Sequence, residues 1–163
     1  MSLFENSLYR WRETYFVLFP HDKRPSAEAI RQGLQKLSGK HQIAEARENE
    51  DAQLEFLTVI SPEDFSAMDL SYLEGEEVLQ QIVEIREELD LDAFTSQEKS
   101  KYKLLDHCDA RFEVYHFEQI SDSEAWGESE EELLDPGSLL LVLARLARLC
   151  EGVAFDPQAG GLL

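Results

Sequence analysis

Residues 106–109, Asp-His-Cys-Asp, are the densest group of reactive side chains in the chain. A thiol beside an imidazole can act as a nucleophile, because the imidazole takes up the thiol proton. Sequence neighbours at a helix-to-strand junction point in different directions, however, and the flanking carboxylates raise the pKa of the Cys108 thiol. We therefore predict that Cys108 is a small apolar residue at the entry to a strand. Cys150 follows a predicted helix, whose negative end disfavours a thiolate, so no catalytic residue is predicted.

Metal ligation is the second chemistry to test against the residue spacing. A calcium loop that begins at Asp122 has Gly127 at its sixth position but Leu133 at its twelfth, where a bidentate glutamate is required. A loop that begins at Asp90 has Lys101 at that place. The four histidines show neither the His-x-His nor the i, i+4 spacing of zinc sites. The chain also lacks a glycine-rich turn between a strand and a helix, so we predict no metal and no cofactor.

Basic residues occur at two places where an anion or a carboxylate is the expected partner. Residues 21–24, His-Asp-Lys-Arg, can hold an anion, but the prolines on either side favour a polar turn. Arg145 and Arg148 lie on one face of an otherwise apolar predicted helix and need acceptors. We expect structural ion pairs with Glu113 or Glu118 on a neighbouring strand.

Carboxylates are the most numerous charged groups, and they are unevenly distributed. The 163 residues carry 34 acidic and 15 basic side chains, which gives a net charge of -19. Residues 1–52 hold eight of each, so the whole net charge lies in residues 53–163. Eleven acids lie within 63–92 and seven within 122–135. Such a surface repels nucleic acid and anionic membranes, and it attracts basic proteins.

A helix and a loop are predicted to carry this charge. In residues 76–89 the apolar residues Val78, Ile82 and Ile85 step by four and three, which is typical of an amphipathic helix with an acidic outer face. Residues 122–135 contain three successive glutamates and are predicted to form a solvated loop. The candidate binding residues are therefore Glu77, Glu84, Glu87 and Glu88 on the helix and Glu128, Glu130, Glu131 and Glu132 in the loop.

The elements that must position these groups follow from hydrophobic periodicity and capping signals. Thr95 and Glu98 have the spacing of a capping box, Gly39 and Gly152 are placed to end helices, and residues 48–51 form the turn of a predicted hairpin. Strands are predicted at 14–19, 43–47, 53–60, 68–72, 111–120 and 153–155, and helices at 26–38, 76–89, 95–106 and 136–149.

This order of elements predicts an α+β fold in which a single sheet of five to six strands is backed by helices. Ferredoxin-like topology, with one extra strand and helix, is the expected form. Strands 14–19 and 111–120 should be neighbouring central strands, because both are apolar on two faces, and helix 136–149 should pack on them. No linker or repeat divides the chain, so residues 1–163 are expected to form one domain.

Two cysteines are too few for a disulfide framework, and the first residues do not have the pattern of a signal peptide. The longest apolar run, 139–144, is six residues, whereas a membrane span needs about 20. These observations predict a cytoplasmic protein without a membrane segment.

The end of the chain carries a resemblance to known proteins. An apolar helix is followed by the residues 150–158, Cys-Glu-Gly-Val-Ala-Phe-Asp-Pro-Gln. The part from Gly152 to Gln158 resembles the helix, glycine, short strand and Asp-Pro-Gln ending of small cytosolic α+β proteins, such as bacterial toxin-immunity proteins and uncharacterised domains. The resemblance implies an acidic binding module without catalysis.

The charge pattern and the failed motifs together predict a non-enzymatic, cytoplasmic protein-binding module whose acidic surface binds a basic protein, and neither nucleic acid nor a membrane. The alternative is a small-molecule-binding domain or a small enzyme whose pocket is assembled from residues distant in the sequence. A third interpretation is that the acidity only keeps the protein soluble, as in cells with a salty interior.

Overall fold

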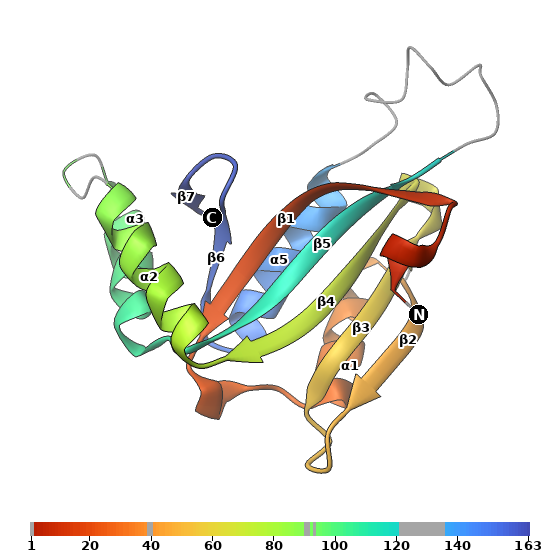
Figure 1. The fold of residues 1–163 in the computed structure, drawn as a ribbon, viewed down its shortest axis with the longest axis horizontal. Coiled ribbons are helices and arrows are strands. Elements are labelled where there is room, and N and C mark those ends of the chain that lie inside the picture. Colours follow the sequence, from red (N-terminus) through yellow and green to blue (C-terminus); the bar gives the residue numbers. More distant parts are fainter. Residues whose placement is uncertain (1, 39–40, 90–91, 93, 121–135) are drawn as a thin grey trace.

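A computed structural model of the chain describes residues 2–38, 41–89, 92, 94–120 and 136–163. These residues form an α+β fold built on one antiparallel sheet of seven strands, in the order β2-β3-β4-β5-β1-β6-β7 (Figure 1). The strands are β1 (Tyr9–Phe19), β2 (Gln42–Glu48), β3 (Leu54–Ser61), β4 (Ser66–Glu74), β5 (Ala110–Gln119), β6 (Val153–Asp156) and β7 (Gly161–Leu162).

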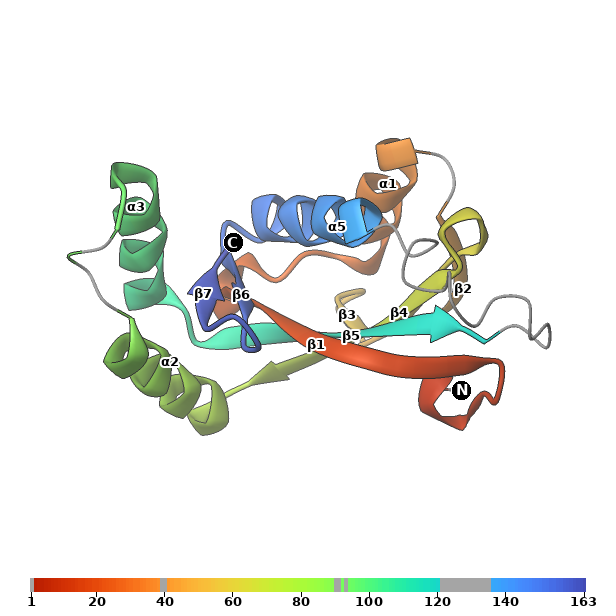
Figure 2. The ribbon, with the colours of Figure 1, turned by 90° about the horizontal axis from the view of Figure 1, so that it is seen from above.

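Helices lie on both sides of this sheet. The helices α1 (Ala27–Ser38) and α5 (Pro136–Leu149) cover one face together, and α2 (Glu76–Glu88) lies against one end of the other face (Figure 2). The helix α3 (Ser96–Leu104) stands at the same end of the molecule, beside β6 and β7. The short 3-10 turn η1 (Leu3–Glu5) covers the far end of the face that carries α2.

The main core lies between the sheet and the pair α1 and α5. It contains alternate residues of the central strands, Val17 and Phe19 of β1 with Phe112 and Val114 of β5, and Leu143 of α5 packs on them. Because side chains alternate along a strand, the intervening residues face the side of α2. A second apolar cluster there is built from Leu18, Val78, Ile82, Ile85, Leu105, Cys108, Val153 and Phe155.

The predicted neighbourhood of the two central strands is confirmed. β1 and β5 pair in antiparallel register, with Val17 opposite Phe112 and Tyr15 opposite Val114, and they occupy the fifth and fourth places in the sheet. The predicted packing of helix 136–149 on these strands is confirmed by the shared core. The predicted hairpin of residues 43–60 is also present, as β2 and β3.

The number of strands and the ferredoxin-like topology are corrected by the structure. The sheet has seven strands rather than five to six, and their order, β2-β3-β4-β5-β1-β6-β7, does not match the ferredoxin-like expectation. The additional strand is β7, which pairs with Phe155 and Asp156 of β6. Two residues that include a glycine carry no alternating pattern, so the sequence did not reveal this strand.

Strand β1 begins at Tyr9, five residues before the predicted start. The additional residues alternate Tyr9 and Trp11 with charged side chains, so they lack the continuous apolar run from which residues 14–19 were predicted. Ion pairs between strands stabilise this extension instead. Arg10 and Arg12 both bind the buried carboxylate of Glu118 on β5, and the Nη1 atom of Arg12 lies 2.9 Å from the Oε2 atom of Glu118.

Gly152 ends α5, as predicted, and the structure shows why a glycine is needed. A Cβ atom at this position would lie 2.1 Å from the carbonyl oxygen of Leu18 on β1. The preceding residue, Glu151, turns the chain with a positive φ of 53°. This close approach lets β6 enter the sheet beside β1 immediately after the helix.

Candidate functional site

The helix α2 presents the predicted acidic face. Val78, Ile82 and Ile85 are buried against the second apolar cluster. The four predicted binding residues of this helix, Glu77, Glu84, Glu87 and Glu88, are all exposed, and so is Glu76 at its first turn. We call these five residues the α2 acidic face. The other predicted residues, Glu128, Glu130, Glu131 and Glu132, lie outside the described residues.

The carboxylates of the α2 acidic face have no cationic partner in the part of the chain that the structure describes. The one basic residue of the helix, Arg86, is bound to Asp106 and lies over the ring of Tyr102, 5.0 Å from its centroid. Two apolar residues of α2, Leu79 and Val83, are also 48% exposed. The helix therefore offers both unpaired negative charge and apolar surface to solvent.

A shallow, open groove of about 550 Å³ lies between this face and β5. It is lined by Glu76, Glu77 and Glu84, by two glutamine amides and by Arg111 of β5. The Arg111 guanidinium is already occupied: it donates to Gln81 Oε1 at 2.8 Å and to Glu113 Oε1 at 2.6 Å. Its charge is therefore balanced by Glu113, and the groove as a whole remains negative.

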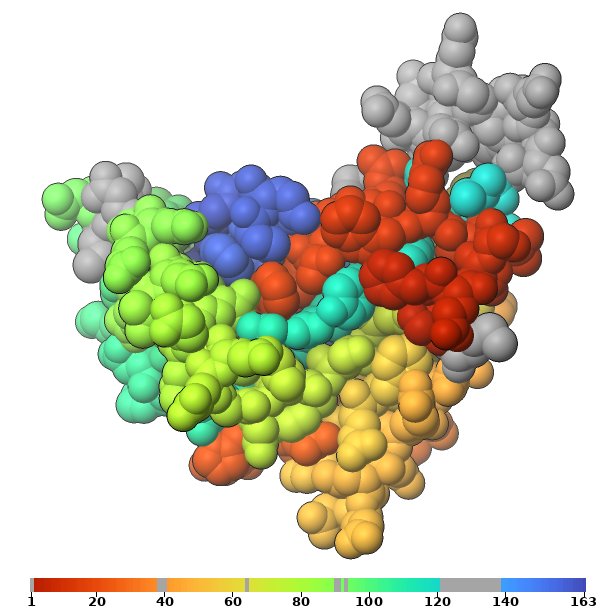
Figure 3. All heavy atoms as spheres, in the orientation of Figure 1, coloured from red at the N-terminus to blue at the C-terminus, as the bar shows by residue number. Residues whose placement is uncertain are grey.

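The floor beside the groove is a part of the sheet that none of the described helices covers. In Figure 3, β5 is visible in a hollow between α2 and the N-terminal residues. Its outward-facing residues Arg111, Glu113 and Tyr115 are half-buried. Tyr115 donates a hydrogen bond to Glu113, and burial together with that carboxylate raises the pKa of Tyr115 to about 12. The hydrogen bonds from Gln81 through Arg111 to Glu113 thus fix α2 against β5.

The four reactive residues 106–109 do not form a catalytic group. Cys108 is 4% exposed and belongs to the apolar cluster under α2, as expected for a packed apolar residue. Burial, with a further contribution from Asp109, raises the pKa of its thiol to about 12. Asp109 binds His21 instead, with 2.6 Å between Oδ2 and Nδ1, and Asp106 binds Arg86. The second thiol, Cys150, is fully buried, which raises its pKa to about 12 as well.

The basic turn after β1 is a structural turn, as predicted. His21 is bound to Asp109, and Lys23 is 3.2 Å from Glu151. Arg24 donates to the carbonyl of Leu54 and lies 3.5 Å from the centroid of the Tyr72 ring. The basic side chains of residues 21–24 therefore bind partners within the fold, and they do not form an anion-binding site.

The predicted ion pairs of Arg145 and Arg148 are wrong. Glu113 is on the sheet face opposite α5, where it accepts from Arg111, and Glu118 binds Arg10 and Arg12. The stem of Arg145 packs beside Gly33 of α1 instead. The pairing was inferred from the expected packing of the helix on the strand; alternation along β5 turns Glu113 to the other face, and Glu118 is bound by the two arginines of β1.

A polar cluster that the sequence did not reveal lies where β1 and β5 pair. Glu13 is opposite His116 in the register, and its Oε1 atom is 3.0 Å from His116 Nδ1. Hydrogen bonding to His116 is the main cause that lowers the pKa of Glu13. The two residues are 103 positions apart, so only the register of the strands could have indicated the contact. The Glu13 carboxylate also lies 3.7 Å from Arg12 Nε, so it is bound within the fold, which favours a structural role.

Within the described residues, no group of three or more His, Cys, Asp or Glu side chains is arranged to hold a metal ion. Among the helices that the structure describes, none combines the length and the apolar character that crossing a bilayer requires.

Comparison with known protein families, with curated protein sequences and with solved structures finds no match to this chain. The resemblance of Gly152 to Gln158 to the ending of small cytosolic proteins therefore stays a prediction.

Proposed function

We propose that the protein is a non-enzymatic, cytoplasmic protein-binding module that binds a basic protein through the α2 acidic face. The observation that carries this proposal is that all five carboxylates are exposed, without a cationic partner among the described residues, beside a negatively charged groove. A lysine or arginine side chain of a partner can enter this groove and complete the missing ion pairs. The two free, buried cysteines agree with a reducing compartment.

The mixed character of α2 supports a protein as the partner. Solvated charge alone contributes little affinity, because exposed ion pairs are worth about 0 to 1 kcal/mol each. Leu79 and Val83, each 48% exposed, add apolar area on the same helix. A basic and partly apolar surface would therefore gain both fast, electrostatically steered association and buried apolar area.

The experiment reverses three charges of α2 and compares them with three matched charges elsewhere. The test variant carries Glu84→Lys, Glu87→Lys and Glu88→Lys. The control carries Glu48→Lys, Glu50→Lys and Asp51→Lys in the β2–β3 hairpin, where the same change of net charge is made at exposed positions. Each protein is immobilised and exposed to an extract of the cells from which the protein comes, at low and at high salt, and bound proteins are quantified by mass spectrometry.

We expect a basic protein to bind the wild type and the hairpin variant but not the α2 variant. With that partner purified, reversal on α2 should slow association by about tenfold or more and flatten its salt dependence. Equal capture by all three proteins would contradict the proposal, and so would binding of duplex DNA by the wild type at moderate salt.

A further inference from the structure

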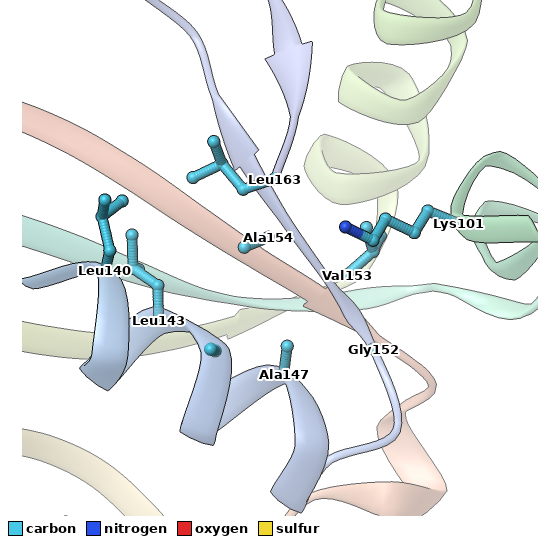
Figure 4. Close-up of a pocket in the computed structure, with 9 residues that line it drawn as sticks. Lys101, Leu140, Leu143, Ala147, Gly152, Val153, Ala154 and Leu163 are labelled. Atoms are coloured by element: carbon cyan, nitrogen blue, oxygen red, sulfur yellow. The ribbon is translucent and has the colours of Figure 1, made fainter. Parts of the chain in front are cut away.

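A second concave surface lies on the other side of the molecule, between α5, β6 and α3. It has a volume of about 440 Å³, within the range of small-molecule sites. Leu140, Leu143, Ala144 and Ala147 of α5 form one wall, and Ala154 of β6 is in the floor (Figure 4). Of the nine residues that line the groove, Lys101 alone has a charged side chain.

The groove exists because small residues are placed where larger ones would fill it. Ala144 and Ala147 of α5 present only methyl groups to it, whereas a Cβ atom at Gly152 would meet the carbonyl oxygen of Leu18 on β1 rather than fill the groove. At the rim, Leu140 remains 46% exposed and Leu163 39% exposed. An apolar ligand would remove this surface from water.

Lys101 is the feature that selects the charge of the ligand. Its side chain reaches from α3 over Val153 and points with Nζ toward Leu163 and Ala154 (Figure 4). It is half-buried, and within the described part of the chain no carboxylate lies within 4.0 Å of its ammonium group. In a chain with 34 acidic residues, a half-buried cation without a carboxylate partner is available to an anionic group.

We propose that this groove binds an amphiphile with an anionic head and an unbranched apolar tail, such as a medium-chain carboxylate. The head group accepts hydrogen bonds from the Lys101 ammonium, and the tail extends past Ala147 and Ala144 toward Leu143 and Leu140. This binding is independent of the α2 acidic face, which lies on the opposite side of the sheet. This proposal is a specific case of the alternative prediction from the sequence, a small-molecule-binding domain.

The test is a calorimetric titration of the full chain with decanoate below its micelle-forming concentration. Decanol and decyltrimethylammonium are compared as probes with the same tail and a neutral or cationic head. We expect one decanoate per chain, and affinity for decanol and for the cation at least tenfold lower. Equal affinity for decanol would overturn the role of Lys101, and the absence of decanoate binding would overturn the site.

Three variants locate the binding. Lys101→Gln should weaken decanoate at least tenfold, whereas Lys103→Gln, an exposed position on the same helix, should leave its affinity unchanged. Ala144→Phe fills the groove from an exposed position of α5 and should abolish binding while thermal unfolding shows an intact fold. Unchanged affinity in Lys101→Gln or in Ala144→Phe would overturn the proposal.

Two further measurements distinguish ligand binding in this groove from membrane contact and from binding at the α2 acidic face. If the protein binds anionic phospholipid vesicles but not monomeric decanoate, the groove is a membrane-contact surface and the proposal is wrong. The α2 charge-reversal variant should bind decanoate with wild-type affinity, so that failure of the α2 interface and failure of this groove are distinguishable.

Discussion

The two thiols illustrate how burial decides the chemistry of a single residue. Cys108 and Cys150 are both buried, and burial is the main cause that raises each pKa to about 12. At neutral pH almost no thiolate is present, and the thiolate is the form that reacts. We expect iodoacetamide to alkylate the folded protein only as fast as it opens, and the unfolded protein rapidly. Rapid alkylation without unfolding would show a reactive cysteine.

The same residues predict the effect of substitution. Cys108→Ser and Cys150→Ser should each cost about 1 to 2 kcal/mol of stability, since a hydroxyl replaces a buried, weakly polar sulfur. Neither change should alter the binding of the partner or of decanoate. Neither side chain is part of the α2 acidic face or of the lining of the groove between α5, β6 and α3, which we call the α5 groove. Loss of either activity in a folded serine variant would contradict this assignment.

The Glu13–His116 pair predicts a dependence of stability on pH. Hydrogen bonding to His116 lowers the pKa of Glu13 below its ordinary value of 4.5. The ionised form is therefore stabilised by folding, and this stabilisation is present above about pH 4.5 and is lost as the pH falls through the lower, folded-state pKa. Glu13→Gln removes the titrating group, so the acid-side loss of stability should become shallower.

Urea unfolding at a series of acidic pH values measures this effect. Glu55→Gln is the matched control, because Glu55 is exposed and has no ion-pair partner among the described residues. It should retain the wild-type slope. If Glu13→Gln also retains it, the pair does not contribute to the pH dependence.

Two leucines of the helix α5 differ in burial, and the stability cost of replacing them should differ accordingly. Leu143 is 1% exposed in the main core, whereas Leu141 is 53% exposed. Leu143→Ala should therefore cost about 2 to 5 kcal/mol, and Val114→Ala on the facing strand about 1 to 3 kcal/mol. Leu141→Ala should cost less than about 1 kcal/mol, because it leaves no cavity. Chemical denaturation measures all three, and a similar cost at the two leucines would contradict the packing described.

The elements themselves were largely predictable, because their signals are local. Val78, Ile82 and Ile85 of α2 are buried as their spacing predicted, and Thr95 caps α3 by accepting from the amide of Glu98 at 3.2 Å. Sequence could not predict how much of each strand face is covered. Strand 111–120 was expected to be covered on both faces, yet Arg111, Glu113 and Tyr115 are half-buried, because α2 covers only one end of that face.

The two grooves differ in how far the sequence could have indicated them. The carboxylates of α2 are near neighbours in one helix, so their common face follows from the helical repeat. The α5 groove instead combines α3, α5, β6 and Leu163, and the helical periodicity of any one of them is consistent with ordinary core packing. Only the tertiary arrangement brings Lys101 to that apolar surface.

At the scale of the whole molecule, the charge asymmetry predicts a response to salt. The net charge of -19 lies in residues 53–163, so the carboxylates there repel one another in the folded protein more than in the expanded chain. Raising the salt concentration from about 0.01 M to about 1 M shortens the screening length from about 30 Å to about 3 Å. We expect the melting temperature to rise over this range, and a fall would show that ion pairs outweigh repulsion.

Neutralising α2 then separates a binding role of the acidity from a role in solubility alone. Glu84→Gln, Glu87→Gln and Glu88→Gln remove three carboxylates that have no ion-pair partner among the described residues. The melting temperature at low salt should rise and its salt dependence should weaken, because repulsion is relieved and no ion pair is lost.

If the acidity serves binding, the same variant must lose the basic partner, as expected when stability is exchanged for function. The hairpin variant with Glu48→Gln, Glu50→Gln and Asp51→Asn should keep the partner. A more stable α2 variant that binds as tightly as the wild type would show that these charges serve solubility rather than recognition.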